Sequence, residues 1–118
     1  MNIQHPRRAR LSAAFAACVL AASLPGHAAD GSPEQFAEGK KLFMQGATPA
    51  CALCHTLKDA GSEGAIGPIL DELKPDAARV ANALRNGLGN MPPYKATLSE
   101  AQILALAHYV AKASGAIP

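Results

Sequence analysis

The stretch Cys51-Ala52-Leu53-Cys54-His55 decides how this chain folds. It has the pattern C-x-x-C-H, two cysteines separated by two residues and followed at once by a histidine. On a helical turn this spacing places both sulfur atoms on one side, where each thiol can add across one vinyl group of a haem. The adjacent His55 can then reach the iron as its proximal ligand. The motif therefore predicts one covalently attached haem, bound through Cys51 and Cys54.

A C-x-x-C pair alone is also found in thioredoxin-like dithiols, in zinc sites and in disulfides. The only other cysteine is Cys18, so the second pair of a zinc site is missing. The sequence has no βαβ pattern to carry a thioredoxin site, and a disulfide across so short a loop would stabilise little. The adjacent histidine, an export signal and a methionine downstream favour the haem.

Residues 1–28 have the features of a cleavable signal peptide. Three arginines lie among the first ten residues, and the apolar run over residues 11–24 is short for a membrane span. We predict cleavage after Ala28 or one residue later, and cleavage after Ala28 leaves one small domain over residues 29–118 with no membrane span. Because haem is attached outside the cytoplasm, the predicted location is the periplasm. A lipoprotein cleavage site at Cys18 is the weaker alternative.

Charge and composition exclude one class of function and point to a cofactor. The full chain of 118 residues carries a net charge of +2 at pH 7, but acidic residues slightly outnumber basic ones beyond Ala28. No basic run exists, so the chain is not predicted to bind nucleic acid. Aromatic residues make up 4% of the chain and tryptophan is absent. So small a domain buries little core by itself, and the haem is expected to serve as part of its core.

Capping signals predict a helix near each end of the domain. Ser32 can cap a helix that begins at Pro33, and Gln35 completes a capping box. This helix is expected to run to about Gln45 and to stop at Gly46.

The last helix is expected to start at Ser99, with Gln102 in a second capping box, and to end at Gly115. A shorter helix is predicted over Pro75–Asn86. No segment has a convincing strand pattern, and the glycine-rich residues 59–68 are expected to form a loop. The predicted fold class is therefore all-α.

A sixth iron ligand has few candidates. Beyond the signal peptide the chain holds two methionines and two histidines. Met91 lies far enough after His55 for the chain to wrap around the haem, and the two prolines that follow stiffen its loop. Met44 lies near the end of the first helix, and His108 is expected to face solvent on the last helix. Met91 is therefore the predicted axial ligand, its alternative role being that of an ordinary apolar loop residue.

The chain resembles the class I monohaem cytochromes c over essentially its whole mature length. In that family an N-terminal helix crosses a C-terminal helix, C-x-x-C-H follows the first and a methionine loop precedes the last. Gly39 and Phe43 are similar to the family's G-x-x-x-F pattern, in which the glycine lets the two helices approach closely. The facing positions on the last helix are Leu106, Tyr109 and Val110.

Residues 67–70, Gly-Pro-Ile-Leu, resemble the G-P-x-L turn of the family. The resemblance implies that the Pro68 carbonyl accepts a hydrogen bond from His55 Nδ1–H, which orients the imidazole and tunes its basicity. Without the family, Pro68 would be only a turn former. The tryptophan that often binds a haem propionate in this family is absent. Tyr94 or a backbone amide is the expected substitute.

A narrower resemblance is to the cytochrome subunit of bacterial sulfite dehydrogenases. It is carried by three stretches of sequence, residues 51–57 (C-A-L-C-H-T-L), residues 66–76 and residues 91–93 (M-P-P). In that family the small cytochrome takes electrons from a molybdenum-cofactor subunit and passes them to another cytochrome or an oxidase. A free-standing carrier for another periplasmic oxidoreductase stays the alternative.

Ligation by both His55 and Met91 would leave the iron with no open position. Such a centre exchanges one electron and binds no substrate, so no catalysis by this chain itself is expected. A haem sensor or peroxidase-like protein is the remaining alternative, which would require that Met91 dissociates readily.

Overall fold

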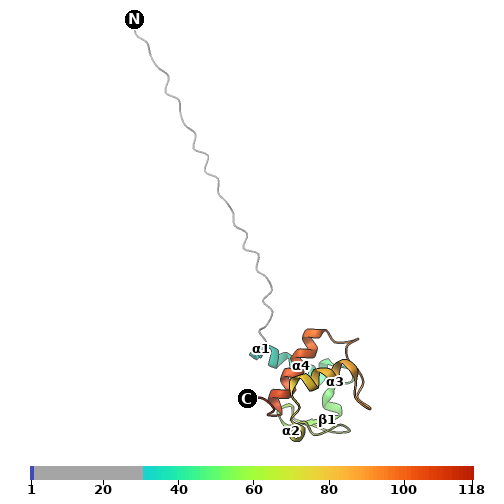
Figure 1. Cartoon of the computed structure of the whole chain (residues 1–118). Coiled ribbons are helices and arrows are strands. Elements are labelled where there is room, and N and C mark those ends of the chain that lie inside the picture. The colour runs from blue at the N-terminus through green and yellow to red at the C-terminus, as the bar shows by residue number, and fades with distance from the viewer. Residues whose placement is uncertain (2–30) are drawn as a thin grey trace.

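The computed structural model describes Met1 and residues 31–118, so the predicted signal peptide lies outside the described residues except for Met1. The described chain is mainly helical (Figure 1). In chain order its elements are α1 (Pro33–Lys41), a π-helix (Leu42–Gly46), a 3-10 turn (Cys51–Leu53), β1 (His55–Leu57), a 3-10 turn (Lys58–Ala60), β2 (Ser62–Ala65), α2 (Leu70–Leu73), α3 (Ala77–Asn86) and α4 (Glu100–Ala113).

The crossing of α1 and α4 forms the centre of the fold, as the family resemblance implies. Gly39 lies at the crossing, where an added Cβ would be 2.5 Å from Tyr109 Cβ and against the Ala105 carbonyl. Tyr109 is fully buried, and its ring packs edge-on against Phe36 and Phe43 at centroid distances of 5.0 and 5.7 Å. Only a residue without a side chain permits this approach of the two backbones.

Three side-chain caps fix where the helices begin. Ser32 accepts a hydrogen bond from Gln35 N at 3.1 Å. The Gln35 side chain accepts from Gly31 N instead of Ser32 N, so the predicted capping box is only half formed. At α4 the capping box of Ser99 and Gln102 is complete. The cap of α3 is Asp76, one residue beyond the predicted start, and it accepts from the backbone of the first turn.

A short β-hairpin replaces part of the predicted loop over residues 59–68. Strands β1 and β2 pair antiparallel, with His55 opposite Ala65 and Leu57 opposite Ser62. Ser62 stabilises the pair with its side chain, because its Oγ accepts from Leu57 N at 3.0 Å and donates to His55 O at 2.8 Å. The prediction of no strand is wrong here, although two such short strands leave the fold class all-α.

Helix α2 and the hairpin are joined by one side chain. Asp71 Oδ2 accepts a hydrogen bond from Lys58 N at 2.9 Å.

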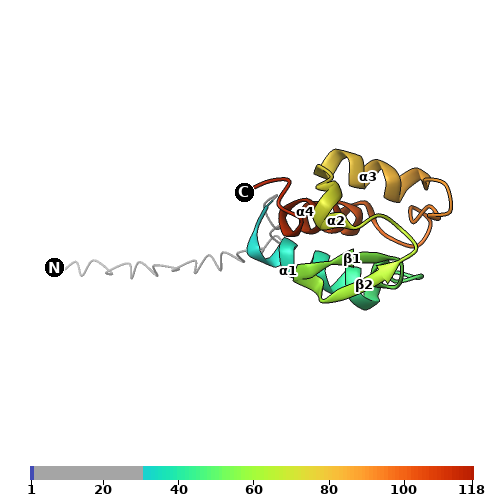
Figure 2. The same ribbon diagram turned by 90° about the horizontal axis from the view of Figure 1, so that it is seen from below.

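Figure 2 shows the hairpin and α3 on opposite sides of α4. The C-x-x-C-H turn and the hairpin thus form one wall of the molecule, and α3 with the following loop forms the other.

His108 does not face solvent, contrary to the prediction. The imidazole is half-buried, and its ring meets Phe36 edge-on at a centroid distance of 6.5 Å. Its Nε2 atom is buried and has no hydrogen-bond partner among the described residues. The apolar stripe of α4 is therefore wider than the spacing of Ile103, Leu106 and Val110 indicates.

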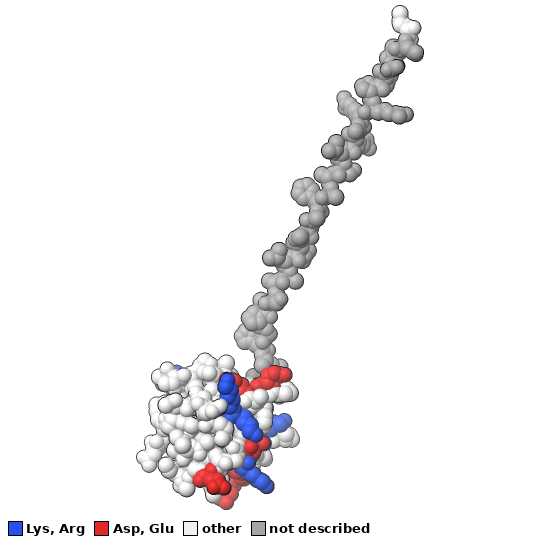
Figure 3. Space-filling model, turned by 180° about the vertical axis from the view of Figure 1, so that it is seen from behind, with Lys and Arg blue, Asp and Glu red and all other residues white. Residues whose placement is uncertain are grey.

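The described surface carries charges of both signs. On the face drawn in Figure 3, Lys and Arg side chains lie beside Asp and Glu side chains rather than in a patch of one sign. Within the described residues, no helix has both the length and the apolar composition needed to cross a membrane.

Candidate haem site

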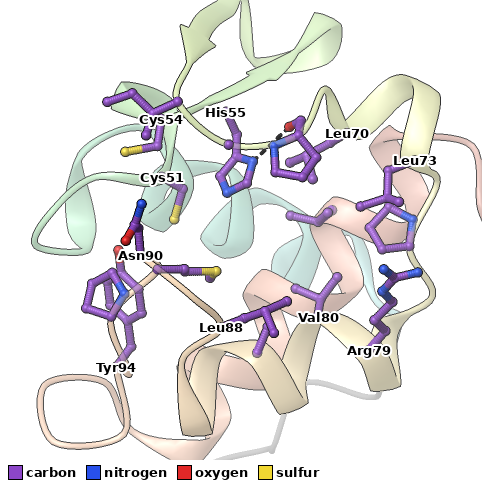
Figure 4. Close-up of a pocket in the computed structure, with 18 of the residues that line it drawn as sticks. Cys51, Cys54, His55, Leu70, Leu73, Arg79, Val80, Leu88, Asn90 and Tyr94 are labelled. Atoms are coloured by element: carbon purple, nitrogen blue, oxygen red, sulfur yellow. Dashed lines mark hydrogen bonds between the residues drawn. The ribbon is translucent and has the colours of Figure 1, made fainter.

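The two walls enclose a cavity of about 640 Å³ that is lined mainly by apolar side chains. It brings together all the residues predicted to bind the cofactor, although they come from three separate segments of the chain (Figure 4). These residues are Cys51, Cys54, His55, Pro68 and Met91. A cavity of this size accommodates a flat macrocycle between a histidine wall and a methionine wall.

The two cysteines lie on the 3-10 turn that begins at Cys51, and Cys54 N donates to Cys51 O at 3.1 Å. Both thiols are free and half-buried, so the pair forms no disulfide. Burial raises the pKa of the Cys51 thiol to about 11, with a smaller contribution of the same sign from Cys54. The folded chain thus keeps Cys51 in the neutral form, which is the weaker nucleophile.

His55 is held in one orientation by the turn that the family resemblance identifies. Its Nδ1 lies 2.9 Å from the carbonyl oxygen of Pro68. A carbonyl oxygen only accepts, so Nδ1 carries the proton and Nε2 keeps its lone pair. In this tautomer the Nε2 lone pair is available to bind an iron.

Gly67 also contacts the imidazole, a role that the sequence did not indicate. A Cβ on Gly67 would lie 2.8 Å from His55 Nδ1 and 2.9 Å from Nε2. The Cys54 carbonyl fixes this contact, because it accepts hydrogen bonds from Ile66 N at 3.1 Å and from Gly67 N at 2.8 Å. The C-x-x-C-H turn therefore positions the residues that in turn orient its histidine.

Met91 is held by a closed loop as well as by the prolines that follow it. Leu88 and Met91 exchange two backbone hydrogen bonds, each of 3.0 Å, and Gly89 between them has a φ of 58°. Gly87 has a φ of 74°, and an added Cβ there would lie 2.8 Å from Met91 O. These two glycines allow the tight path that places Met91 in the cavity wall.

Tyr94 lines the cavity, yet its hydroxyl is already engaged. It donates to the carbonyl oxygen of Pro49 at 2.8 Å. Burial raises the pKa of Tyr94 to about 12, so the hydroxyl remains a donor over the physiological range. Figure 4 shows Tyr94 and Asn90 at the cysteine end of the cavity.

The apolar lining of the cavity includes Ile66, Leu70 and Leu88. Leu53 is 67% exposed and lies outside the cavity, and Leu84 is buried in the protein core instead. Arg79 also lines the cavity, although no sequence pattern predicted it. It lies one helical turn before Ala83, and both residues line the cavity from the same face of α3, but the sequence pattern alone does not show that this face meets the cavity.

The donor set fits a haem and not a zinc ion. No group of three or more His, Cys, Asp or Glu side chains is placed to hold a metal among the residues that the structure describes. The cavity instead offers two thiols at one end, one oriented imidazole and one thioether, in apolar surroundings. Two thiols, an imidazole and a thioether are the groups that attach and ligate a haem.

A helical fold that closes a C-x-x-C-H turn and a methionine loop around one apolar cavity defines a class I c-type cytochrome. The sequence profile of the family described as "Cytochrome C oxidase, cbb3-type, subunit III" matches residues 34–110. The chain is also similar to the c-type cytochrome SorU from Sinorhizobium meliloti. The crystal structure of that protein matches with a TM-score of 0.69 at 46% sequence identity, and the match covers 71% of this chain and 95% of that chain.

The chain therefore belongs to this cytochrome c family, whose members carry electrons on covalently bound haem c. No curated protein sequence matches it.

Proposed function

We propose that this chain is a periplasmic electron carrier that holds one haem c through Cys51 and Cys54, with His55 and Met91 as the axial ligands. The observation that carries the proposal is the convergence of these four side chains in one cavity. A haem bound in this way supplies reversible one-electron chemistry, and a thioether ligand favours its reduced state.

The protein residues have separate tasks in this function. Pro68 and Gly67 fix the plane and the tautomer of His55. The loop from Leu88 to Met91 holds the thioether. If His55 and Met91 both held the iron, no open position would remain for a substrate, and the haem would exchange only electrons.

The composition of the cavity disfavours a peroxidase-like function. Peroxide cleavage needs an acid–base group beside the iron. No Asp or Glu side chain lines the cavity, and His108, the second histidine of the described chain, does not line it either.

The apolar wall of the cavity also limits access of water, and exclusion of water raises the reduction potential of a buried haem.

We further propose that the electron donor is a molybdenum-cofactor subunit that oxidises sulfite, and that the acceptor is another cytochrome or an oxidase. Support comes from the likeness of residues 51–57, 66–76 and 91–93 to the cytochrome subunit of sulfite dehydrogenases. Leu53 contributes exposed apolar surface between the two cysteines, where a partner could approach the haem edge.

Stopped-flow absorbance of the haem tests this donor. The oxidised protein is mixed with sulfite alone, with a purified molybdenum-cofactor sulfite-oxidising enzyme alone, and with both together. We expect reduction of the haem only when both are present, with a rate that saturates as the carrier concentration increases. A protein that is reduced by ascorbate but not by this mixture would contradict the proposed donor and leave the carrier function in place.

A further inference from the structure

Of the described residues that line the cavity, Arg79 alone is a lysine, arginine, aspartate or glutamate. It projects from the first turn of α3, where its backbone N donates to the cap Asp76 at 2.7 Å. Within the described residues its guanidinium has no carboxylate partner, whereas Arg85 on the same helix pairs with Glu100. An arginine at the edge of an apolar cavity, free of a protein counter-ion, is suited to a bound anion.

The position of Arg79 matches the charged end of a haem. The vinyl groups that become thioethers lie on one half of the macrocycle, and the two propionates lie on the other half. Figure 4 shows Cys51 and Cys54 at one end of the cavity and Arg79, beside Leu73, at the other. A macrocycle held by the two cysteines therefore extends its carboxylates toward the end at which Arg79 lies.

Other polar groups in the cavity are less suited to this role. Tyr94 donates its proton to Pro49, and both Tyr94 and Asn90 lie at the cysteine end. Asn82 lines the cavity wall, and its Oδ1 accepts a hydrogen bond from Asn86 Nδ2 at 2.9 Å, which leaves an uncharged amide as its only donor. None of these three carries a positive charge.

We propose that the Arg79 guanidinium binds one propionate of the haem and neutralises the charge of that carboxylate. The assignment rests on the proposed function, because it requires a haem attached at Cys51 and Cys54. A guanidinium and a carboxylate form a charge-assisted, often bidentate pair, which keeps the carboxylate ionised. Arg79 thereby holds the pKa of that propionate low.

The test is a spectroelectrochemical titration of the haem-containing protein over a range of pH. Arg79→Gln should lower the midpoint potential at neutral pH, because an unpaired propionate stabilises ferric iron. As the pH falls, protonation of that propionate should bring the potential back up. The propionate pKa should be higher than in the wild type by about 1 unit or more.

Two further variants separate charge from folding. Arg85→Gln removes the same charge from the same helix outside the cavity, and it should keep the pH profile of the wild type. Arg79→Lys keeps the positive charge and should keep a potential close to that of the wild type, even where Arg79→Gln yields too little folded protein. Equal profiles for Arg79→Gln and the wild type, or equal profiles for Arg79→Lys and Arg79→Gln, would overturn the assignment.

The same samples distinguish this assignment from the function on which it rests. The covalent haem content of the wild type is measured first, by mass spectrometry. A wild type without haem contradicts the proposed function, and the Arg79 assignment with it. A haem-containing wild type with an unaffected Arg79→Gln variant contradicts the Arg79 assignment alone.

Discussion

Gly67 lies against the face of the His55 imidazole, so closely that a Cβ would be 2.8 Å from Nδ1 and 2.9 Å from Nε2. The same turn supplies the Pro68 carbonyl that accepts the hydrogen bond from Nδ1 at 2.9 Å. Two adjacent residues therefore act together on one ring. The first allows the ring to lie in the cavity wall, and the second sets its tautomer.

Gly67→Ala should displace the imidazole and weaken its hydrogen bond to Pro68. We expect a loss of about 1–3 kcal/mol in the free energy of unfolding, as is typical when a methyl group is forced into a packed site. NMR or electron paramagnetic resonance of the ferric protein should show altered histidine ligation. Gly61→Ala, in the hairpin that precedes Gly67, is the control, because an added Cβ there meets no atom within 4 Å and the substitution acts only through the backbone φ of 62°. Unchanged ligation in Gly67→Ala would contradict the role given to Gly67.

Met91→Ala should leave the haem covalently attached but open the iron. Without the thioether the ferric state is favoured, so the midpoint potential should fall, and carbon monoxide or cyanide should bind readily. Met44→Ala is the matched control, because Met44 is 40% exposed and does not line the cavity. Absorbance titration with cyanide and a redox titration measure both effects. A Met91→Ala protein with the potential of the wild type would refute the ligand assignment.

Cys51→Ser combined with Cys54→Ser should prevent stable attachment of the haem. Both thiols line one end of the cavity, and no other cysteine occurs among the described residues. A serine hydroxyl forms no thioether, and we expect that denaturation and acid extraction remove all haem from the double variant. The wild type treated in the same way should keep its haem. Haem that survives extraction in the double variant would show attachment at another site.

The contact between Tyr109 and Asp59 predicts how stability depends on pH. Tyr109 Oη donates to Asp59 Oδ2 at 2.8 Å, and Lys40 Nζ lies 3.1 Å from the same oxygen. Burial alone would raise the pKa of Asp59, but the hydrogen bonds from Tyr109 and Lys40 and the charge of Lys40 lower it below its ordinary value of 3.8.

Because the Asp59 pKa is lower in the folded state, the unfolded chain takes up its proton first as the pH falls. The contribution of Asp59 to stability is therefore present above about pH 3.8 and is lost as the pH falls through the lowered pKa. Tyr109→Phe should reduce this loss and cost about 1 kcal/mol at neutral pH. Glu63→Gln, on the exposed side of β2, is the control, and chemical denaturation at each pH is the measurement. A steeper acid loss in Tyr109→Phe than in the wild type would contradict the contact.

The parts of the fold that could be predicted are those encoded by nearby residues. The caps at Ser32 and Ser99 mark helix starts because a side chain and the backbone a few residues on form the bond. The C-x-x-C-H motif and the methionine loop are short and chemically specific. They therefore indicate which residues share a site even though the chain between them is long.

The missed features depend on contacts between distant residues or on side-chain direction. The hairpin is held by Ser62 and by its position under α2, neither of which gives a periodic pattern over so few residues. His108 is half-buried because Phe36 of α1 covers it, a contact that the pattern of α4 alone does not contain. From the sequence alone, Arg79 is expected to be an ordinary surface charge, and only the structure shows that it lies at one edge of the cavity.

Native mass spectrometry of the protein purified gently from its own periplasm tests the central claim most directly. We predict the mass of residues 29–118 plus one haem that survives denaturation, alone or in a complex with a molybdenum-cofactor subunit. The single processed chain with haem identifies a free carrier, and the larger complex identifies the electron-accepting part of a sulfite dehydrogenase. A mature chain without haem would contradict the assignment of Cys51, Cys54, His55 and Met91 as a haem site.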